Sequence, residues 1–343
     1  MLKKIHWCQL VLTLLLSGCA SQPIEHNEIT NSSGQSVPPH AAPESQPQPL
    51  LNNSFPESTQ PYYAEMISGD FSQSHDLQKF IDNMVTKHGF SSTYLNGLFS
   101  QAQRLEQVIN LESPAPYQGP SKPRLGSWTR YRNKFLTDDH IKHGVEFWRN
   151  NAQAVQRASQ TYGVDPEYIV AIIGVETYFG RNIGKTKIFD ALSTLAFATH
   201  RRAKYFSSEL EHYLLMTREQ HYEPRQPVGS WAGAMGLGQF MPSSFRKLAV
   251  DFDHNGRCDI WQPTDAIGSV AHYFAKHGWQ RQRPVTQPSR PSNNETVIEL
   301  STYQGSEFWQ IHPNFKVIKR YNNSNKYAMA VHQLAQAIKQ RYL

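Results

Sequence analysis

One glutamate at the end of an apolar helix pattern is well placed to carry acid chemistry. Ile169, Ile172, Ile173 and Glu176 follow the i, i+3, i+4, i+7 spacing of one helical face. The Glu176 carboxyl is therefore expected on the face that the isoleucines bury, and burial raises a carboxyl pKa because it disfavours the charged form. A carboxylic acid kept protonated near neutral pH is suited to donating a proton.

The helix that would position Glu176 is marked at both ends within residues 165–181. Asp165 suits the N-cap, Pro166 needs no backbone donor at the first helical position, and Gly180 favours the left-handed conformation that ends helices. The pattern predicts one amphipathic helix. Its glutamate could also turn to solvent or pair with Arg181, so this helix alone leaves the role of Glu176 open.

A glycine-rich segment, G-S-W-A-G-A-M-G-L-G-Q-F-M-P-S-S, occupies residues 229–244. Glycines at this density weaken a helix, so the segment is predicted to be a loop shaped by its backbone. Its bare backbone and the amide of Gln239 could approach a polar ligand closely. Tight packing against the core would explain the same glycines.

Residues 251–265 resemble a calcium-binding loop. Asp251, Asp253, Asn255 and Gly256 fill positions 1, 3, 5 and 6 of the EF-hand pattern. The Arg257 carbonyl could serve at position 7, but position 12 is Gln262 instead of glutamate, and we expect Asp265 to replace that ligand. The sequence predicts a structural calcium ion; a turn that binds no ion is the alternative.

The first residues have the features of a bacterial lipoprotein signal. Lys3 and Lys4 precede a short apolar run and the sequence L-S-G-C, which ends at Cys19. Residues 1–18 are predicted to be a signal peptide, and residues 19–61, rich in Pro, Ser, Asn and Gln, a disordered tether behind a lipidated Cys19. An ordinary signal peptide with an incidental cysteine is the alternative.

Composition limits the classes of function. The 343 residues include 34 Lys or Arg and 28 Asp or Glu, a formal net charge of +6 without a clustered basic patch, which argues against nucleic acid as the partner. Cleavage before Cys19 would leave only that cysteine and Cys258, so no disulfide framework is expected.

Most of the folded sequence is predicted to be helical. Helices are expected from Ser74 to Gly89, from Ser91 or Ser92 to Leu111, from Thr137 to about Ala158, and over 189–200, 203–219 and about 325–340. Strands are expected at 296–302, 307–312 and 315–321. The segment from Arg320 to Tyr327 combines aromatic and amide groups that suit sugar rings, although capping of the last helix accounts for them equally.

Four motifs in order, G-V-E-T-Y-F-G-R, A-M-G-L-G-Q-F-M-P-S-S, D-F-D-H-N-G and R-Y-N-N-S-N-K-Y, resemble the membrane-bound lytic murein transglycosylase B family. The resemblance implies a mainly α fold over 62–343, with a lysozyme-like helical core, an additional helical domain and a small β-containing insertion at about 280–320. The family's calcium loop carries Ser at the position of Asp253 and Asp at that of Asn255, so this chain moves one carboxylate within the loop and keeps their number, and the insertion is shorter than usual.

By motif match, the resemblance makes Glu176 the catalytic acid and base. It places nine residues around the glycan substrate: Ser230, Gln239, Arg201, Arg202, Tyr131, Tyr273, Tyr321, Asn322 and Tyr327. It also implies an outer-membrane lipoprotein facing the periplasm, a monomer without an organic cofactor.

The activity implied is non-hydrolytic cleavage of peptidoglycan between MurNAc and GlcNAc, leaving a 1,6-anhydroMurNAc end. A hydrolytic muramidase is one alternative and would need a second carboxylate such as Glu209, Glu211 or Asp190. A catalytically silent wall-binding lipoprotein is the other.

Overall fold

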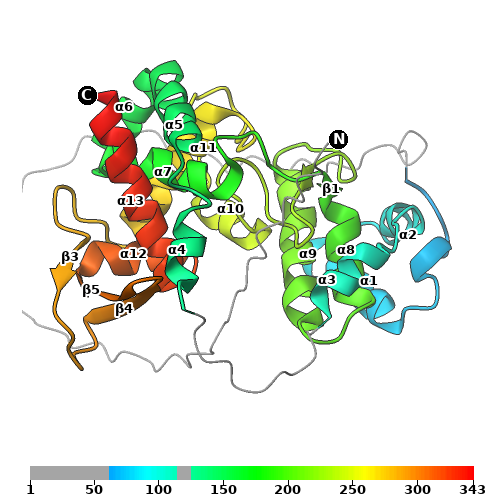
Figure 1. The fold of residues 1–343 in the computed structure, drawn as a ribbon. Coiled ribbons are helices and arrows are strands. Elements are labelled where there is room, and N and C mark those ends of the chain that lie inside the picture. The colour runs from blue at the N-terminus through cyan, green and yellow to red at the C-terminus, as the bar shows by residue number, and fades with distance from the viewer. Residues whose placement is uncertain (1–61, 114–124) are drawn as a thin grey trace, which may run out of the picture. The chain divides into compact units, whose positions relative to one another are not determined.

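The computed structural model describes residues 62–113 and 125–343 (Figure 1). The predicted signal peptide, Cys19 and the tether of residues 19–61 lie outside these ranges. The described residues are mainly helical, as predicted. The earlier helices are α1 (His75–His88), α2 (Ser92–Ser100), α3 (Glu106–Glu112), α4 (Ser127–Arg132), α5 (Asp138–Asn150), α6 (Ala152–Tyr162) and α7 (Pro166–Thr177), after a 3-10 turn at Gly69–Phe71. The later helices are α8 (Ile188–Phe197), α9 (Ala203–Glu219), α10 (Pro242–Leu248), α11 (Pro263–Lys276), α12 (Pro313–Tyr321) and α13 (Asn325–Tyr342).

Two of the predicted helices are each broken in two. The segment predicted as one helix to Leu111 forms α2 and α3, because the amides of Gln103 and Leu105 between them donate to Asp190 and Thr194 of α8. The segment predicted from Thr137 to about Ala158 forms α5 and α6. Asn151 separates them, with φ −120° and ψ 24°, and its side-chain amide donates to the Phe147 carbonyl.

Helix α7 is buried on all sides, so the prediction of an amphipathic helix is wrong. Every residue from Glu167 to Val175 is buried, and α7 packs against α13, α5, α6 and α11. The helix ends at Thr177, and the left-handed stretch that follows it begins at Tyr178, with φ 52°, and includes Gly180, with φ 84°. Asp165 makes no side-chain cap; its carboxylate instead accepts hydrogen bonds from Trp279 Nε1 at 2.9 Å and from the Gln282 amide at 3.1 Å.

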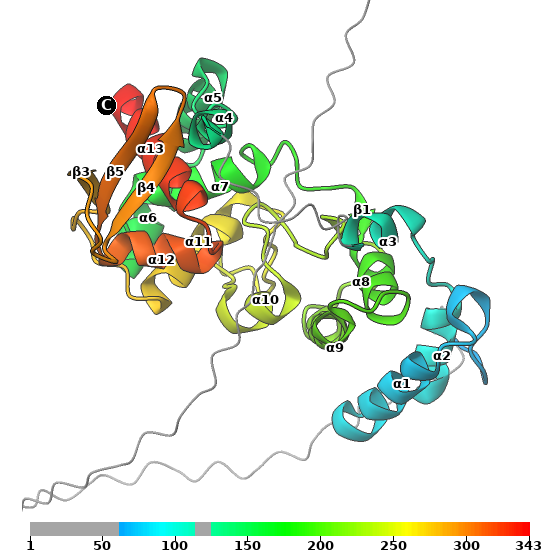
Figure 2. The same cartoon turned by 60° about the horizontal axis from the view of Figure 1, so that its bottom comes forward.

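A three-stranded antiparallel sheet is formed by β3 (Thr286–Ser289), β4 (Val297–Thr302) and β5 (Gly305–Ile311) in the order β3-β5-β4, which Figure 2 shows. Strands β4 and β5 match predicted strands, while β3 was not predicted. The strand predicted at 315–321 is wrong: this segment is α12, with Pro313 in its first turn and Phe315 and Ile318 buried one helical turn apart.

The two ends of the sheet-bearing segment meet at one asparagine. Asn314 is fully buried, its Oδ1 accepts from the Gln280 amide at 2.8 Å, and its Nδ2 donates to the carbonyls of Gln280 and Arg283 at 2.7 and 3.1 Å. These bonds satisfy the backbone groups at the base of the segment.

The other small sheet pairs β1 (Thr186–Lys187) with β2 (Val228–Gly229) and joins the loop after α7 to the start of the glycine-rich segment. Helices α8 and α9 pack along each other, and α3 packs on α8. Within the described ranges, none of the helices combines the length and apolarity needed to span a membrane.

Candidate active site

Glu176 lies in the last turn of α7 and is partly exposed to solvent. Its carboxylate Oε1 accepts a hydrogen bond of 2.5 Å from the hydroxyl of Tyr327. Tyr327 is buried in the first turn of α13, where the Ser324 side chain caps the helix by accepting from the Tyr327 amide. Packing of α13 against α7 therefore brings a phenol donor to the carboxyl.

Burial raises the pKa of Glu176 from 4.5 to about 7, and the hydrogen bond from Tyr327 lowers it in part. No charged side chain among the described residues contributes to this shift. Arg181, the partner considered from the sequence, instead lies 3.9 Å from the Glu146 carboxylate and over the Tyr178 ring. The surroundings thus keep a substantial fraction of Glu176 protonated near neutral pH.

Three of the predicted substrate-binding tyrosines interact with Glu176, and the fourth, Tyr273, packs against one of them. Burial raises the pKa values of Tyr131, Tyr321 and Tyr327, and the charge of Glu176 adds to each shift, so these phenols lie within its electrostatic reach. The Tyr273 ring centroid is 4.6 Å from that of Tyr321. The carboxyl therefore faces neutral phenols.

The glycine-rich loop is fastened beside Glu176 by two hydroxyl groups. Thr177 donates to the Leu237 carbonyl at 2.9 Å, and Tyr321 donates to the Gly238 carbonyl at 2.7 Å. A Cβ at Gly238 would lie 2.9 Å from the Tyr321 hydroxyl oxygen, so the close approach requires glycine there. The loop is thus positioned by groups on both sides of the glutamate.

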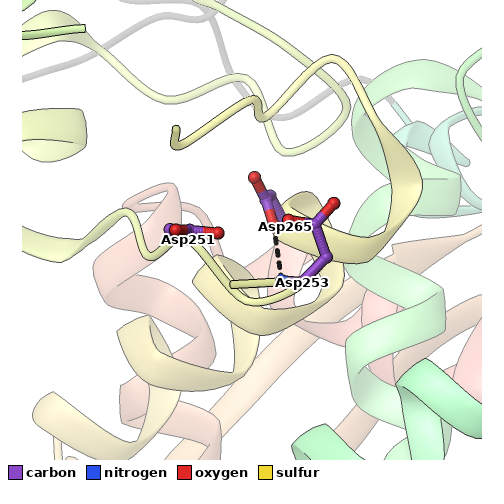
Figure 3. A group of neighbouring side chains, drawn as sticks. All are labelled: Asp251, Asp253 and Asp265. Carbon is purple, nitrogen blue, oxygen red and sulfur yellow. Dashed lines mark hydrogen bonds between the residues drawn. The ribbon is translucent and has the colours of Figure 1, made fainter. Parts of the chain in front are cut away.

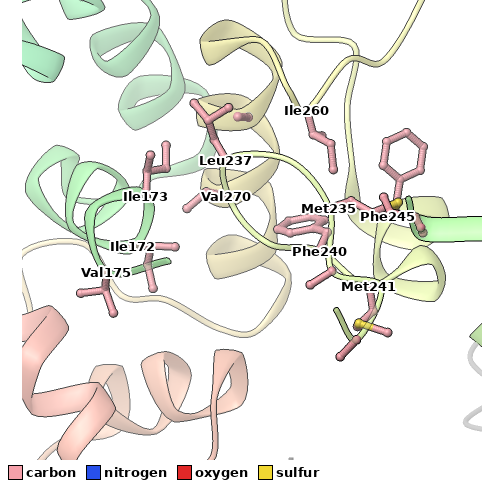
Figure 4. Packing of buried hydrophobic residues seen from close by; sticks show 14 of the residues in the cluster. Ile172, Ile173, Val175, Met235, Leu237, Phe240, Met241, Phe245, Ile260 and Val270 are labelled. Atoms are coloured by element: carbon pink, nitrogen blue, oxygen red, sulfur yellow. The ribbon is translucent and has the colours of Figure 1, made fainter. Parts of the chain in front are cut away.

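Apolar packing also holds this loop. Figure 4 shows Ile172 and Ile173 of α7, Val270 of α11 and Leu237 of the loop turned toward a common apolar region, and all four are buried. The sequence offered two explanations for the glycines, close approach to a ligand and tight packing against the core. The loop packs against the core and also lies beside the Glu176 carboxyl, so both explanations apply.

Three other predicted residues keep polar groups available. Ser230 Oγ accepts from the Ala234 amide at 2.9 Å, and its hydroxyl proton has no acceptor among the described residues. Gln239, with φ 52°, donates from Nε2 to the Gly236 carbonyl at 2.9 Å, while its Oε1 receives no bond from the described residues. Asn322 is partly exposed at the end of α12.

Arg201 and Arg202 are not brought into contact with Glu176 or its tyrosines. Both bind the carboxylate of Glu112, which is only 1% exposed at the end of α3. Glu112 was not predicted as a functional residue. Its partners lie about ninety positions away in the sequence, so no local pattern could identify it.

The carboxylates considered as a second catalytic group are all bound elsewhere. Glu209 accepts from the amide and hydroxyl of Ser243, and Asp190 accepts from the Gln103 amide. Glu211 pairs with Lys87 and His88, each at 2.8 Å. No contact joins any of the three carboxylates to Glu176.

The predicted calcium ligands Asp251, Asp253 and Asp265 converge, with one carboxylate oxygen of each lying within 4.8 Å of the others, as Figure 3 shows. Asp265 is buried in the first turn of α11 and accepts from the amides of Phe252, Asp253 and Asp259. The buried carboxylate of Asp265 thus fixes the loop, and the more exposed carboxylates of Asp251 and Asp253 add hard oxygen donors of the kind that calcium binds.

The other two predicted ligands have defined surroundings. Asn255 Oδ1 accepts from the Arg257 amide at 2.9 Å, and its Nδ2 donates to Asp253 at 3.0 Å. The Arg257 guanidinium carbon lies 3.9 Å from the centre of the Tyr222 ring. This cation–π contact gives the arginine a partner outside the carboxylate cluster.

A hollow of about 440 Å³ lies at the start of α1, lined by residues that include Asp70, Arg104 and His200. None of the predicted site residues lines it. The hollow is therefore separate from the candidate active site at Glu176.

Comparisons with known proteins agree on one family. The transglycosylase SLT domain matches residues 72–296 and 285–336. Membrane-bound lytic murein transglycosylase B of Escherichia coli is 46% identical over 307 residues, 79% of this chain and 85% of that protein.

Solved structures with the same fold include complexes with bound ligands. The E. coli lytic transglycosylase SLT35 in complex with calcium has a TM-score of 0.75 at 44% identity, covering 81% of this chain and 96% of its own. SltB3 of Pseudomonas aeruginosa in complex with NAG-NAM-pentapeptide has a TM-score of 0.67 at 26% identity, covering 78% and 80%.

Proposed function

Because the chain belongs to the membrane-bound lytic murein transglycosylase B family, we propose that it cleaves peptidoglycan between MurNAc and GlcNAc without using water. The observation that carries this proposal is the isolation of Glu176. Its pKa is raised by burial, its hydrogen-bond partner is a phenol, and no second carboxylate within residues 62–113 and 125–343 acts on it. Hydrolysing glycosidases ordinarily use two carboxylates, whereas one suffices if the same residue serves first as acid and then as base.

In this mechanism Glu176 first gives its proton to the bridging oxygen. The bond from that oxygen to C1 of MurNAc breaks, and the GlcNAc O4 leaves as a hydroxyl. The C6 hydroxyl oxygen of the same MurNAc then bonds to C1, and its proton returns to the Glu176 carboxylate. Atoms balance without water, the product ends in 1,6-anhydroMurNAc, and the attack within one sugar gains from proximity.

The residues around Glu176 have matching roles. Tyr327 holds the carboxyl by its hydrogen bond and stabilises the anion that remains after proton donation. The free hydroxyl proton of Ser230 and the free oxygen of Gln239 are assigned to polar groups of the sugars, with the Ser230 dipole or the MurNAc acetamido group steadying the positive centre at C1. Tyr131, Tyr273, Tyr321 and Asn322 are assigned to the glycan.

Mass spectrometry of muropeptides released from purified sacculi tests the proposal. We expect residues 62–343 to release fragments one water lighter than reducing-end products, and Glu176→Gln to lower their release by about a thousandfold or more, since it removes both acid and base. Glu106→Gln, at an exposed glutamate 3.3 Å from Arg104, is the matched control. Reducing ends would indicate a hydrolase, and sacculus binding without fragments a binding protein.

We also propose that Asp251, Asp253, Asn255, Arg257 and Asp265 hold a structural calcium ion, with Arg257 contributing its backbone carbonyl. The convergence of three carboxylates within 4.8 Å supports this, because like charges so close repel one another without a cation. When bound, calcium would offset two of the three negative charges of these carboxylates.

Calorimetry with and without calcium checks the ion. We expect chelation to lower the Tm by several degrees, since a ligand that binds only the folded state stabilises it by mass action. Asp251→Asn should reduce that calcium-dependent shift. An equal Tm with calcium and with chelator would reject the site.

The anchoring of the protein is a further part of the proposal. Residues 1–18 are assigned to a lipoprotein signal and Cys19 to lipid attachment, with residues 19–61 linking it to a monomeric catalytic region at the periplasmic face of the outer membrane. The name of the E. coli relative, which is membrane-bound, supports an anchor. Cys19→Ala protein that still fractionates with the outer membrane would contradict the lipid assignment.

A further inference from the structure

The turn that follows Glu176 has an uncommon backbone conformation. Tyr178 and Phe179 both lie in the left-handed region, with φ 52° and 58°. Residues with a side chain rarely occupy this region, because the Cβ crowds the backbone carbonyl oxygen, whereas glycine adopts it without strain. Two such residues in succession must therefore be stabilised by contacts of their side chains.

Phe179 is held in the core between two helices. Its side chain is buried, and its ring fills the space beside two glycines. A Cβ at Gly174 of α7 would lie 2.5 Å from Phe179 Cζ, and a Cβ at Gly144 of α5 would lie 3.0 Å from the same atom. The Phe147 ring also contacts it, with the two ring centroids 5.8 Å apart. Packing thus fixes the second residue of the turn.

Tyr178 is held instead by polar groups of α5. Its hydroxyl donates to the Asp139 carboxylate and lies 2.6 Å from His143 Nδ1, from which it accepts. Asp139 and His143 lie four residues apart on one face of α5. The hydroxyl therefore joins the first residue of the turn to α5.

The same turn folds back onto Thr177, the neighbour of Glu176. The Gly180 amide donates to the Thr177 hydroxyl oxygen at 3.0 Å, and the Asn182 amide donates to the Thr177 carbonyl at 2.8 Å. The Thr177 hydroxyl donates to the Leu237 carbonyl of the glycine-rich loop at 2.9 Å. A displacement of the turn would therefore move the loop relative to Glu176.

We propose that Tyr178 is a positioning residue for the cleavage reaction: its hydroxyl anchors the turn to α5 and so keeps the glycine-rich loop aligned with the Glu176 carboxyl. This inference rests on the proposed function. The loop carries Ser230 and Gln239, which are assigned to polar groups of the sugars. Misplacement of groups at the reacting bond lowers the rate steeply, while the tyrosines assigned to the glycan still bind it. Loss of the anchor should therefore lower kcat more than it raises KM.

Steady-state kinetics on soluble, uncrosslinked peptidoglycan strands tests the anchor. We expect Tyr178→Phe, which removes only the hydroxyl, to lower kcat about three- to tenfold and to change KM less than about twofold, since one hydrogen bond is lost. Asp139→Ala should lower kcat by a similar factor. The double variant should lose no more than either single variant, because all three lack the same bond. Asp138→Ala, at the neighbouring carboxylate that pairs with Arg341, is the matched control and should keep the kcat of the unsubstituted protein.

A second variant separates the side chain from the backbone conformation. Glycine adopts the φ of 52° at position 178 without strain, so we expect Tyr178→Gly to lower the Tm by at most a few degrees. Its kcat should nevertheless fall at least as far as that of Tyr178→Phe. If the left-handed turn served only to end α7, glycine would support it equally well and kcat would not change.

Three kinetic results would overturn the proposal: an unchanged kcat in Tyr178→Phe, an unchanged kcat in Tyr178→Gly, or losses that add in the double variant. A fall in kcat that only follows the fraction of unfolded protein, measured by circular dichroism at the assay temperature, would also overturn it and leave Tyr178 a purely structural role. Failure of the proposed function is distinguishable, because the unsubstituted protein would then release no anhydro fragments.

Discussion

Two glutamates in this protein, the buried Glu112 and the partly exposed Glu176, have opposite chemistry. The carboxyl of Glu176 has a phenol for its partner and no cation, so burial raises its pKa to about 7. Burial would likewise raise the pKa of Glu112, but the hydrogen bonds and charges of Arg202 and Arg201 outweigh it and hold that pKa below the ordinary value. The difference teaches that burial alone does not set protonation; the partner decides between an acid and a fixed anion.

Replacing Glu112 should have the largest effect on stability. Glu112→Gln leaves Arg202 without its bidentate partner, and we expect it to lower the free energy of unfolding by about 3 kcal/mol near neutral pH, as for other broken buried pairs. Glu106→Gln on the same helix should cost less than about 1 kcal/mol, since its pair is exposed. Urea titration of both variants measures the difference, and equal losses would contradict it.

The cost of Glu112→Gln should also depend on pH. The pKa of Glu112 is lower in the folded protein than its ordinary value of 4.5, so the stabilisation is complete above that value and is lost as pH falls through the folded pKa.

Glu176→Gln should show the opposite dependence on pH. The folded pKa of about 7 exceeds the ordinary 4.5, so wild-type stability falls as pH rises from 4.5 through 7, while that of the glutamine variant does not. At pH 8 we expect the variant to gain on the wild type by up to about 3 kcal/mol, reduced by the partial exposure of the carboxyl. Urea titrations at pH 5 and pH 8 check this; a constant difference would contradict the raised pKa.

Tyr327→Phe should have the smallest effect, on the pH profile of kcat. The Tyr327 hydrogen bond lowers the pKa of Glu176, so its loss should move the alkaline limb of the profile to higher pH. It should also lower kcat by about tenfold, because one stabilising hydrogen bond to the anion is lost. A limb that moved to lower pH would show that the phenol does not act on the carboxyl.

The sequence predicted the position of Glu176 but not its surroundings. Its spacing from Ile169, Ile172 and Ile173 was sufficient to place it among buried residues, and all three isoleucines are fully buried. The left-handed Tyr178 and Phe179 could not be anticipated, because only Gly180 carries a local signal for that conformation. Contacts with α5 hold them there: Tyr178 bonds to His143, and Phe179 packs against Phe147.

The aspartate cluster could be predicted from neighbouring residues in the sequence, whereas the role of Glu112 could not. Asp251, Asp253 and Asp265 are close in sequence, so their spacing was enough to predict that they converge. Glu112 finds its partners across the fold, and the strand predicted at 315–321 failed because α12 is decided by the partners that bury Phe315 and Ile318. In both cases contacts between residues far apart in the sequence decide the outcome, and for α12 they override the local preference for a strand.

Because of Asn314, the sheet-bearing segment can change in length during evolution independently of the helices on either side of it. The Asn314 side chain joins Gln280 and Arg283 to the start of α12. It therefore fixes the distance between α11 and α12 regardless of the length of the segment that connects them. Insertions and deletions within residues 284–312 can therefore accumulate, or a foreign segment can be grafted there, without displacing the helices that carry Tyr273 and Tyr321.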